Sequence, residues 1–370
     1  MATLAEEKPA LRHLSSIDGG LVMSVLLLSA IGLATVHSAS SEMPVDYLPR
    51  QALWLGIGVL LLVAAMSVDY HLLLDFSIVL YAVGLVLLVL VLVAGVSHGG
   101  AAHWTRIGPW QFQPSEFAKL ATILVLARYL SGLNRRVLTL PQILVAVAIV
   151  AVPMVLVLIE PDLGSSMMFA PILLGMLLVA GVRLRLLLIA AVAAVVLAAG
   201  MWSFGMRSYQ RQRVLTFLSP ETDPLGAGYQ VRQSKIAVGS GEMTGKGYMQ
   251  GTQSQLRFLP VRHTDFILSV LAEEWGFLGV VTVLGLYSLY VASAARIAMR
   301  ARDRAGILLV TGLLSVLCFH VLYNSAMVVG FVPITGIPLP FLSYGGSFTM
   351  VNFVGTGTML GVDLRRYVNR

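Results

Sequence analysis

The chain has 370 residues, of which 57% are hydrophobic and only 12% are charged, and its formal net charge is +7. Soluble proteins carry roughly 25% charged residues, so this chain has too few charges to cover a water-exposed surface of its size. The composition excludes a soluble globular protein, a disordered chain and a nucleic-acid-binding protein with a conventional polar surface. It indicates a protein that crosses a membrane several times.

Ten segments are apolar and long enough to cross a bilayer, which takes about 20 helical residues. The weakest is the fourth, because Lys119 and Arg128 lie within it, but charges near the ends of a span can snorkel or face protein. In chain order the predicted spans are approximately 21–38, 52–68, 76–97, 114–131, 139–159, 164–182, 186–204, 266–295, 306–330 and 341–362. We therefore predict an all-α polytopic membrane protein. Its single ten-helix domain covers 21–364, between an N-terminal tail (1–20) and a C-terminal tail (365–370).

The distribution of basic residues predicts the orientation of these spans. With ten spans both termini lie on one side, and the segments on that side hold fourteen Lys and Arg residues. The short loops on the other side hold two, Arg50 and Arg106. Because Lys and Arg accumulate in cytoplasmic loops, both termini are predicted to be cytoplasmic.

A long loop, approximately 205–264, connects the seventh and eighth spans on the outer side. It carries eight basic residues against three acidic ones. Long loops cross the membrane regardless of charge, so the loop does not change the predicted topology. Its excess of positive charge predicts a role beyond that of a tether.

Ionisable residues at or within membrane spans are the first candidates for function, because each must be paired, hydrated or used. Glu116 and Lys119, in QPSEFAKL, are three residues apart and therefore share one helix face. They form either a structural ion pair or the polar wall of a cavity in which Lys119 faces an anionic substrate.

Two carboxylates, Glu160 and Asp162, lie in the EPDLG segment between the fifth and sixth spans. The Pro and Gly residues are typical of an exposed turn. Because the turn lies at the outer edge of two apolar spans, the carboxylates could instead bind a cation or line a pocket.

The strongest local signal is RHTDF, at the outer start of the eighth span. Thr264 is predicted to cap this helix, with Asp265 in its first turn. Glu273 lies eight residues further on, roughly 12 Å along a helix axis. This exceeds the ~5–9.5 Å between the paired carboxylates of glycosidases, so Asp265 acts alone or with carboxylates of other spans.

Three prolines interrupt VPITGIPLP before the tenth span, and FLSYGGS, which contains Ser343, follows. Such a backbone cannot face lipid as a helix, so it must line a cavity or pack within the protein. Together the candidates gather in the outer half of the membrane. This arrangement suits a lipid-linked, phosphate-bearing substrate, with Lys and Arg binding a diphosphate and a carboxylate accepting a hydroxyl proton.

The segments RHTDFILSVLAEEWGF, QPSEFAKL, EPDLG and PLPFLSYGGS closely resemble the SEDS family (shape, elongation, division and sporulation proteins) over about residues 20–365. GTQSQLRFLP, at 251–260, is more similar to the elongation branch, which maintains rod shape, than to the division branch. The resemblance implies a ten-span peptidoglycan glycosyltransferase of the bacterial cytoplasmic membrane. Such an enzyme polymerises lipid II into β-1,4 glycan strands and releases undecaprenyl diphosphate, with inversion at the anomeric carbon.

By this resemblance Asp265 matches the essential aspartate of the family and is the expected general base. Glu116, Lys119 and Asp162 match polar residues that line the family's central cavity, and Ser343 matches the serine of the family's FLSYGG segment. Glu160 is a further candidate for substrate binding. We add the basic residues Arg207, Arg211, Arg213 and Lys246 as candidates for binding the diphosphate.

The resemblance also implies a partner, a class B penicillin-binding protein that crosslinks the strands, and contact with membrane lipid. A Mg²⁺ or Mn²⁺ ion near Asp265 or Asp162 is a further hypothesis. The alternatives are a lipid II flippase, a scaffold for the penicillin-binding protein and a division-type polymerase. Since the inner halves of the spans are almost uncharged, a polymerase is favoured over a flippase.

Overall fold

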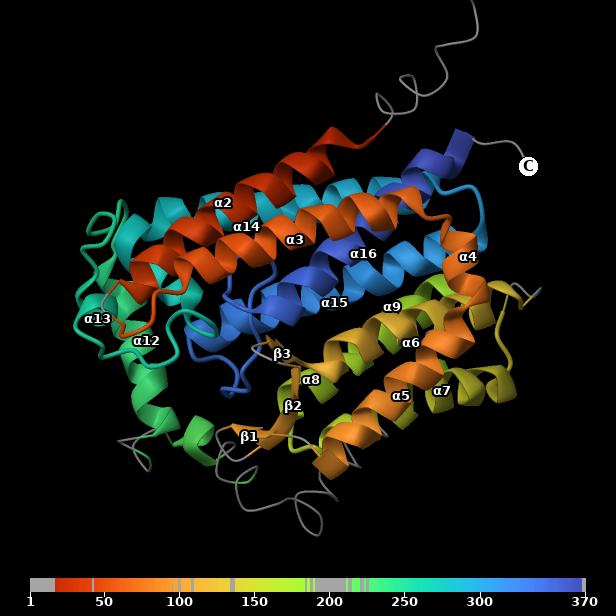
Figure 1. Cartoon of the computed structure of the whole chain (residues 1–370), viewed down its shortest axis with the longest axis horizontal. Helices are drawn as coiled ribbons and strands as arrows, with labels where there is room; N and C mark the ends of the chain where they lie inside the picture. Colours follow the sequence, from red (N-terminus) through yellow and green to blue (C-terminus); the bar gives the residue numbers. More distant parts are fainter. Residues whose placement is uncertain are drawn as a thin grey trace, which may run out of the picture.

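The computed structural model describes residues 17–41, 43–94, 96–98, 101–107, 110–133, 137–183 and 226–367, together with 185–186, 189, 211, 215–219 and 223. Long helices run side by side along the long axis of the molecule (Figure 1). The helices α12 and α13 lie at one end of this bundle, and the described end of the chain lies at the other (Figure 1).

The predicted spans, apart from the seventh, coincide with helices. The seventh, 186–204, lies almost wholly outside the described residues, so the count of ten remains a prediction. The helices are α2 (Gly19–Ser40), α3 (Leu48–Ser67), α5 (Ser77–Ala94), α6 (Pro114–Ser131), α7 (Leu140–Ile159), α8 (Leu163–Met167) with α9 (Phe169–Ala180), α14 (Ile267–Arg300), α15 (Arg304–Val328) and α16 (Gly346–Leu364).

Six of the spans within the described residues are helices long and apolar enough to cross a membrane: Gly19–Ser40, Leu48–Ser67, Leu140–Ile159, Leu163–Ala180, Ile267–Arg300 and Arg304–Val328. The fourth span is α6, and its two cations are accommodated by protein. Lys119 is buried, and Arg128 donates to the backbone oxygens of Leu74 and Asp75 at 3.2 and 2.7 Å. The chain is thus a predominantly helical, multi-pass membrane protein.

A small antiparallel sheet joins α5 to α6. Its strands are β1 (Val96–His98), β2 (Ala101–Ile107) and β3 (Trp110–Phe112), in the order β1-β2-β3. In the register Val96 is opposite Trp104 and Arg106 is opposite Gln111. The sequence analysis did not predict this sheet, which adds a short β element to a fold that is otherwise helical as expected.

Several of these helices begin with a residue whose side chain caps the first turn. Asp18 accepts from the backbone N of Leu21 at 3.1 Å to begin α2, and Asp303 accepts from that of Gly306 at 2.7 Å to begin α15. Thr139 and Gln142 form a capping box at α7. Each cap satisfies N–H groups that the first helical turn leaves without a partner.

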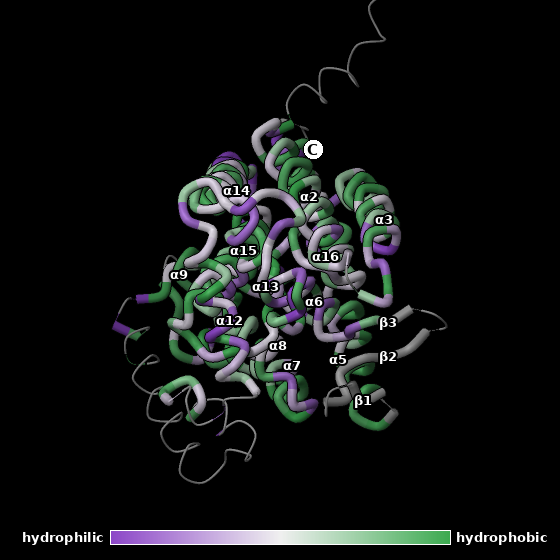
Figure 2. The backbone as a smooth tube through the Cα atoms, turned by 90° about the vertical axis from the view of Figure 1, so that its left-hand side faces the viewer, coloured by the Kyte–Doolittle hydropathy of each residue, from purple (hydrophilic) through white to green (hydrophobic). Residues whose placement is uncertain are grey.

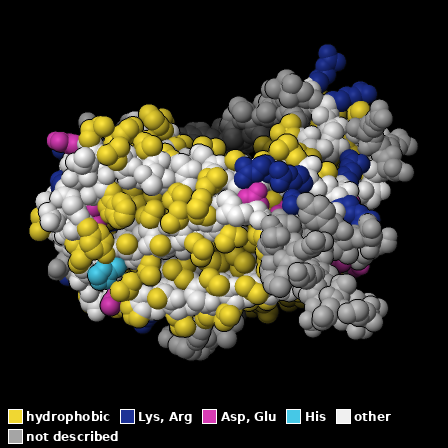
Figure 3. Space-filling view, turned by 90° about the horizontal axis from the view of Figure 1, so that it is seen from above, with side chains coloured by type: hydrophobic (Ala, Val, Ile, Leu, Met, Phe, Trp, Pro, Cys, Tyr) yellow, Lys and Arg dark blue, Asp and Glu magenta, His cyan; other side chains and the backbone are white. Residues whose placement is uncertain are grey.

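Both ends of the described chain meet at one end of the bundle, which we call the termini end. The backbone N of Asp18 donates to Asp363 Oδ2 at 3.1 Å, and Arg296 pairs with Asp18 at 3.2 Å. The first and last described segments of the chain are therefore in contact, and the side of the membrane on which the termini lie stays a prediction. On the face seen in Figure 3, hydrophobic side chains spread over the middle, and Lys and Arg gather toward the right, where the C-terminus lies in Figure 1.

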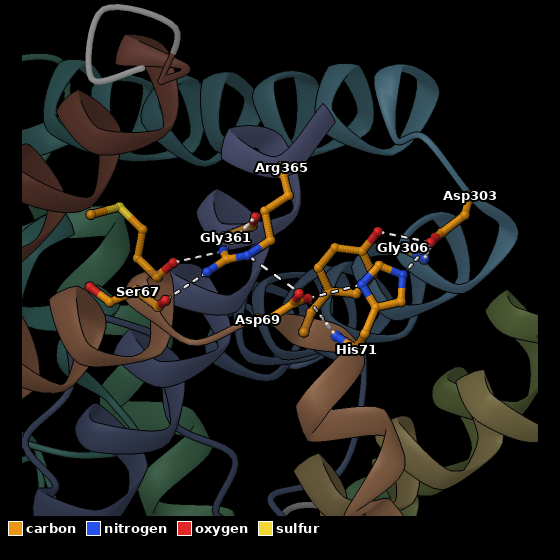
Figure 4. Close-up of polar contacts among 9 residues, drawn as sticks. Ser67, Asp69, His71, Asp303, Gly306, Gly361 and Arg365 are labelled. Carbon is orange, nitrogen blue, oxygen red and sulfur yellow. Dashed lines mark hydrogen bonds and ion pairs between the residues drawn. The ribbon is translucent and has the colours of Figure 1, made fainter. Parts of the chain in front are cut away.

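A cluster of polar side chains lies at the termini end (Figure 4). It consists of Asp69, His71, Asp303 and Arg365, and we call it the clasp. The ring of His71, in α4 (Tyr70–Asp75), lies between Asp69 at 2.9 Å and Asp303 at 2.6 Å. Arg365, in η2 (Arg365–Tyr367), donates to the backbone oxygen of Ser67 at 2.6 Å and lies 3.8 Å from Asp69. The clasp therefore joins the α3–α4 and α14–α15 connections to the end of α16.

The described part of the long loop is packed onto the bundle. It contains α12 (Ala227–Ser240) and α13 (Thr252–Gln255). Ser234 of α12 donates to the backbone oxygen of Val328 at 2.7 Å and lies 2.9 Å from the hydroxyl of Ser269. These bonds tie α12 to both α14 and α15.

Helix α14 is interrupted at Gly276, where φ is 64° and ψ is −162°. The loop segment 242–247 satisfies the backbone groups that the break exposes. Phe277 N donates to Glu242 O at 2.8 Å, and Lys246 N donates to Glu273 O at 3.0 Å. A Cβ at position 276 would overlap the backbone nitrogen of Gly245, so glycine is required both for its positive φ and for this close approach. The sequence predicted an uninterrupted span here.

Candidate functional site

Asp265 lies on an irregular segment at the end of the bundle opposite the termini, which we call the Asp265 end. The segment precedes α14, which begins at Ile267, and Asp265 is partly exposed. The prediction that Thr264 caps the helix is wrong, because its hydroxyl donates to the backbone oxygen of Val261 at 3.3 Å. Asp265 consequently precedes the first helical turn instead of lying within it.

Asn324 of α15 joins the backbone at Asp265 to the proline-rich segment that precedes α16. Asn324 Nδ2 donates to the backbone oxygens of Asp265 and Ile337, at 2.8 and 2.7 Å. A Cβ at Gly336 would lie 3.5 Å from Asp265 Oδ2, so the backbone passes close to the carboxylate. Ile337, Leu339 and Leu342 are buried, which confirms that this non-helical segment packs within the protein.

Ser343 lies beneath this segment and is fully buried. Its hydroxyl donates to the backbone oxygen of Thr264 at 2.7 Å and accepts from the backbone N of Leu339 at 2.9 Å. The geometry gives Ser343 a positioning role, because it fixes the residue before Asp265. Its predicted contact with substrate stays a prediction.

Glu116 and Lys119 form a buried ion pair with 2.7 Å between Lys119 Nζ and Glu116 Oε1. Lys119 is only 3% exposed. Both side chains also line a cavity of about 40 Å³ between α6, α14, α15 and α16, whose wall is mainly apolar and includes residues His320, Asn352 and Thr356. The ion-pair interpretation is therefore confirmed, and the predicted contact of Lys119 with an anionic substrate stays a prediction.

The two carboxylates of the EPDLG segment have different surroundings. Glu160 is 1% exposed, and neither carboxylate oxygen has a hydrogen-bond partner among the described residues, so for Glu160 the exposed-turn interpretation is wrong. Burial, and then the charge of Asp162, raise the pKa of Glu160 to about 8. Asp162 is partly exposed and caps α8 by accepting from Ser165 N at 2.9 Å.

Gln113 connects the ends of α6, α8 and α16 at the Asp265 end. Its side chain donates to Asp162 at 3.0 Å and to Ser165 at 3.2 Å, and its backbone N donates to the hydroxyl of Ser347 at 3.2 Å. Viewed onto the Asp265 end, hydrophilic stretches near α6, α12 and α13 lie among mostly hydrophobic helices (Figure 2). This end of the bundle therefore contains a connected set of polar side chains.

The basic residues proposed to bind a diphosphate are not gathered in one place by the described structure. Lys246 is occupied by the buried carboxylate of Glu273, with 2.8 Å between Lys246 Nζ and Glu273 Oε1. Glu273 also accepts from the backbone N of Gln253 at 2.9 Å, so the ion pair shapes the loop. Arg211 is exposed, and Arg207 and Arg213 lie outside the described residues.

The metal hypothesis draws little support from the described residues, which contain no group of three or more His, Cys, Asp or Glu side chains that could hold an ion. Mg²⁺ takes six oxygen ligands, commonly from one or two carboxylates, water and substrate phosphates. Asp265 or Asp162 could supply a single ligand to such an ion, but the residues present do not form a metal site on their own. We therefore derive no step through a metal.

Comparison with known proteins identifies the family. Residues 20–367 match the FtsW/RodA/SpoVE family of cell cycle proteins. The chain belongs to this family. Its relatives include peptidoglycan glycosyltransferase MrdB of Escherichia coli K12, 38% identical over 95% of this chain and 94% of MrdB. Peptidoglycan glycosyltransferase RodA of Treponema pallidum is 34% identical over 96% of this chain and 99% of that protein.

Solved structures share the fold of this chain. A chain from a peptidoglycan synthase complex that coordinates polymerisation and crosslinking matches with a TM-score of 0.83 and 34% identity, covering 95% of this chain and 99% of that one. The rod-shape-determining protein RodA of Thermus thermophilus matches with a TM-score of 0.72 and 31% identity, covering 95% and 98%. The recognition of a SEDS protein of the RodA type is therefore confirmed.

Three residues with clear places in this site were missed from the sequence: Gln113, Asn324 and His320. Asn324 and His320 lie within the apolar ninth span, where a polar side chain must find a partner, and this signal could have singled them out. Gln113 precedes Pro114 directly, in a segment where only Glu116 and Lys119 drew attention. A neutral amide gives no comparable signal before its neighbours are known.

Proposed function

We propose that this protein is a peptidoglycan glycosyltransferase that polymerises lipid II into β-1,4 glycan strands for cell elongation. The proposal is carried by the placement of Asp265 on an irregular, partly exposed segment, in a chain whose relatives are named peptidoglycan glycosyltransferases. The resemblance to the RodA branch favours elongation over division.

In the proposed reaction Asp265 is the general base. It accepts the proton of the 4-hydroxyl of an N-acetylglucosamine of lipid II as that oxygen attacks the anomeric carbon of the growing strand. The bond from this carbon to the diphosphate breaks, and undecaprenyl diphosphate leaves with the bonding electrons. One displacement inverts an α-linked donor to a β-linked product and needs one base, consistent with a single dominant carboxylate. A positioned base contributes typically 10²–10⁴-fold to the rate.

Other residues support this assignment by what they can supply. The Glu116–Lys119 pair places a cation in the cavity wall, where an ion pair is screened less than in water. Asp162, held by Gln113, is suited to bind hydroxyl or amide groups of a sugar. Arg207, Arg211 and Arg213 remain our candidates for the diphosphate, and Lys246 is a weaker one because Glu273 occupies it.

We also propose that the protein lies in the bacterial cytoplasmic membrane with both termini in the cytoplasm. The basic residues that gather toward the termini end in Figure 3 support this orientation. It places Asp265 on the outer side, where a class B penicillin-binding protein would crosslink the strands. The similarity to a chain of a peptidoglycan synthase complex supports such a partner.

The test compares the wild-type protein with Asp265→Asn, both purified and supplied with lipid II, with glycan chains resolved on a gel. We expect the variant to lose polymerisation by a factor of at least about 10². Asp46→Asn is the matched control, since Asp46 is exposed at the same end and Asn can still accept its bond from Leu48 N.

Equal polymer from wild type and Asp265→Asn would refute the general-base assignment. A wild type that makes no polymer, with or without a penicillin-binding protein, but moves fluorescent lipid II across vesicle membranes would instead support the flippase alternative. If neither activity appears and a penicillin-binding protein still binds to Asp265→Asn, the scaffold alternative is favoured.

A further inference from the structure

Three aromatic rings from three separate segments pack together at the Asp265 end. The rings of Tyr47 and His263 are stacked, with centroids 4.6 Å apart and planes at 14°. Tyr344 packs edge-on against Tyr47 with a centroid distance of 4.7 Å, and lies 5.8 Å from His263. We call these three residues the aromatic platform.

The platform is built on the segments that hold Asp265. His263 lies two residues before Asp265, and its backbone oxygen accepts from the backbone N of Tyr344 at 2.9 Å. Tyr344 follows the positioning residue Ser343, and Tyr47 precedes α3 directly. Gln51, one turn into α3, is fully buried, donates to the backbone oxygen of Ser343 at 3.4 Å and accepts from Gly345 N at 3.4 Å. These bonds fix the three rings relative to Asp265.

The platform rings are half-buried, so each keeps part of its surface accessible. Burial, followed by the charge of Arg262, lowers the pKa of His263 to about 4, and burial raises the pKa of Tyr344. The rings of His263 and Tyr344 are therefore neutral near pH 7. Arg50, which hydrogen-bonds Tyr344, is exposed and adds a donor at the rim.

Flat neutral rings with polar groups at their rim are suited to carbohydrates. A pyranose ring has an apolar face of C–H groups that packs on aromatic surfaces, and hydroxyl or acetamido groups that hydrogen-bond at the edge. Aromatic residues that anchor a protein at the membrane interface need no mutual contact. Here the three rings contact one another, and His263 lies two residues before Asp265, the proposed base.

We propose that the aromatic platform binds a pyranose ring of the substrate or product strand beside Asp265. This inference rests on the proposed function and adds to it a site for the sugar, which the polar cavity residues do not provide. A ring held on the platform would be kept within reach of Asp265 while the lipid stays in the membrane.

The first experiment measures polymerisation of lipid II as a function of its concentration for Tyr47→Leu and Tyr47→Phe. Leucine keeps the apolar bulk and loses the ring, so we expect KM to rise about tenfold, as for loss of one aromatic contact. Phenylalanine keeps the ring and should retain the wild-type KM. Tyr248→Leu is the matched control, because Tyr248 is 43% exposed at the same end and bonds to His37 outside the platform.

An unchanged KM in Tyr47→Leu would overturn the proposal. If kcat and the melting temperature also fall at constant KM, the ring has a structural or interfacial role instead.

The second experiment does not depend on activity. It uses saturation-transfer NMR to detect binding of a soluble β-1,4-linked disaccharide of N-acetylglucosamine to the wild-type protein in detergent. We expect transfer to the sugar that is weakened in Tyr47→Leu and kept in Tyr248→Leu.

The proposal would also be overturned if no saturation transfer to the disaccharide is seen with the wild type, or if the transfer is equal in all variants. A wild type that binds the disaccharide through Tyr47 but makes no polymer would refute the proposed function and leave the platform standing. The two proposals therefore fail separately.

Discussion

The two ends of the bundle differ in how completely their carboxylates are paired. At the termini end the carboxylates of Asp18, Asp69, Asp303 and Asp363 each lie against an arginine or a histidine. At the Asp265 end, Glu160 is buried and its oxygens have no hydrogen-bond partner among the described residues. There the Glu116–Lys119 pair also borders a cavity instead of being closed off by packing.

This difference separates stability from function. The clasp of His71 with Asp69 and Asp303 joins chain connections, and its half-exposed ion pairs contribute modestly to stability. Buried polar groups that are incompletely satisfied cost free energy, so they persist where they have another use. Variants at the two ends should therefore differ in what they impair.

The largest effect is expected for Lys119→Met, which leaves the buried carboxylate of Glu116 without its cation. Breaking a buried pair costs about 3–5 kcal/mol, so the melting temperature in detergent should fall together with polymerisation. The double variant Lys119→Met/Glu116→Gln removes both charges and should recover the melting temperature but not the activity. Full activity in the double variant would mean that the pair is only structural.

An intermediate, pH-dependent effect is expected for Glu160→Gln. Because the pKa of Glu160 is raised to about 8 in the folded protein, wild-type stability should fall as pH rises from about 4.5 toward 8, where the unfolded chain ionises and the folded one does not. Glutamine removes this cost, so the variant should have a higher melting temperature than wild type. The difference in the free energy of unfolding should grow from pH 5 to pH 8 and reach roughly 2–4 kcal/mol.

Asp162→Asn provides the comparison for Glu160. It removes the neighbouring charge, the second cause of the raised pKa, so the pH-dependent loss of stability should be smaller than in the wild type. Melting curves of Glu160→Gln and wild type that differ by a constant amount at every pH would contradict the assignment.

The smallest effect is expected for Asp303→Asn at the termini end. Asparagine can keep the helix cap but loses the carboxylate oxygen that contacts His71 and accepts from Tyr70, at a cost of about 1 kcal/mol. Burial raises the pKa of Asp303, but hydrogen bonds from Gly306 N, His71 and Tyr70 lower it overall. The contribution of the carboxylate is therefore present above its usual pKa near 4 and is lost as pH falls below it.

Melting temperatures of wild type and Asp303→Asn should accordingly differ at pH 7 and converge toward pH 3. Polymerisation by the variant at pH 7 should equal that of wild type. A loss of activity without a loss of stability would show that the termini end takes part in function and would remove the contrast between the two ends.

Local sequence patterns predicted much of this protein because a bilayer imposes strict demands on composition. Any span needs about 20 apolar residues, so the helices α2, α3, α6 and α7 could be placed to within a few residues. The same argument singled out Glu116, Lys119, Glu160, Asp162 and Asp265, because ionisable groups at membrane depth are costly. Three closely spaced prolines likewise predicted a buried non-helical segment before α16.

Features that depend on pairing between distant segments could not be predicted in this way. The break at Gly276 is stabilised by a loop some thirty residues earlier, and Thr264 was taken for a cap because its true neighbours were unknown. Gln113 and Asn324 matter only because of what they contact.

Local properties of the sequence were enough to predict that the chain spans a membrane and which family it belongs to. Apolar length, charge placement and motif are such properties, so each could be seen without a structure. How the charged groups are used became clear only from the folded chain. It buried Glu160 without partners, paired Lys119 with Glu116 at a cavity, tied Lys246 to Glu273, and stacked Tyr47 on His263. The energy of a charge or a ring depends on neighbours that the chain brings together only when it folds.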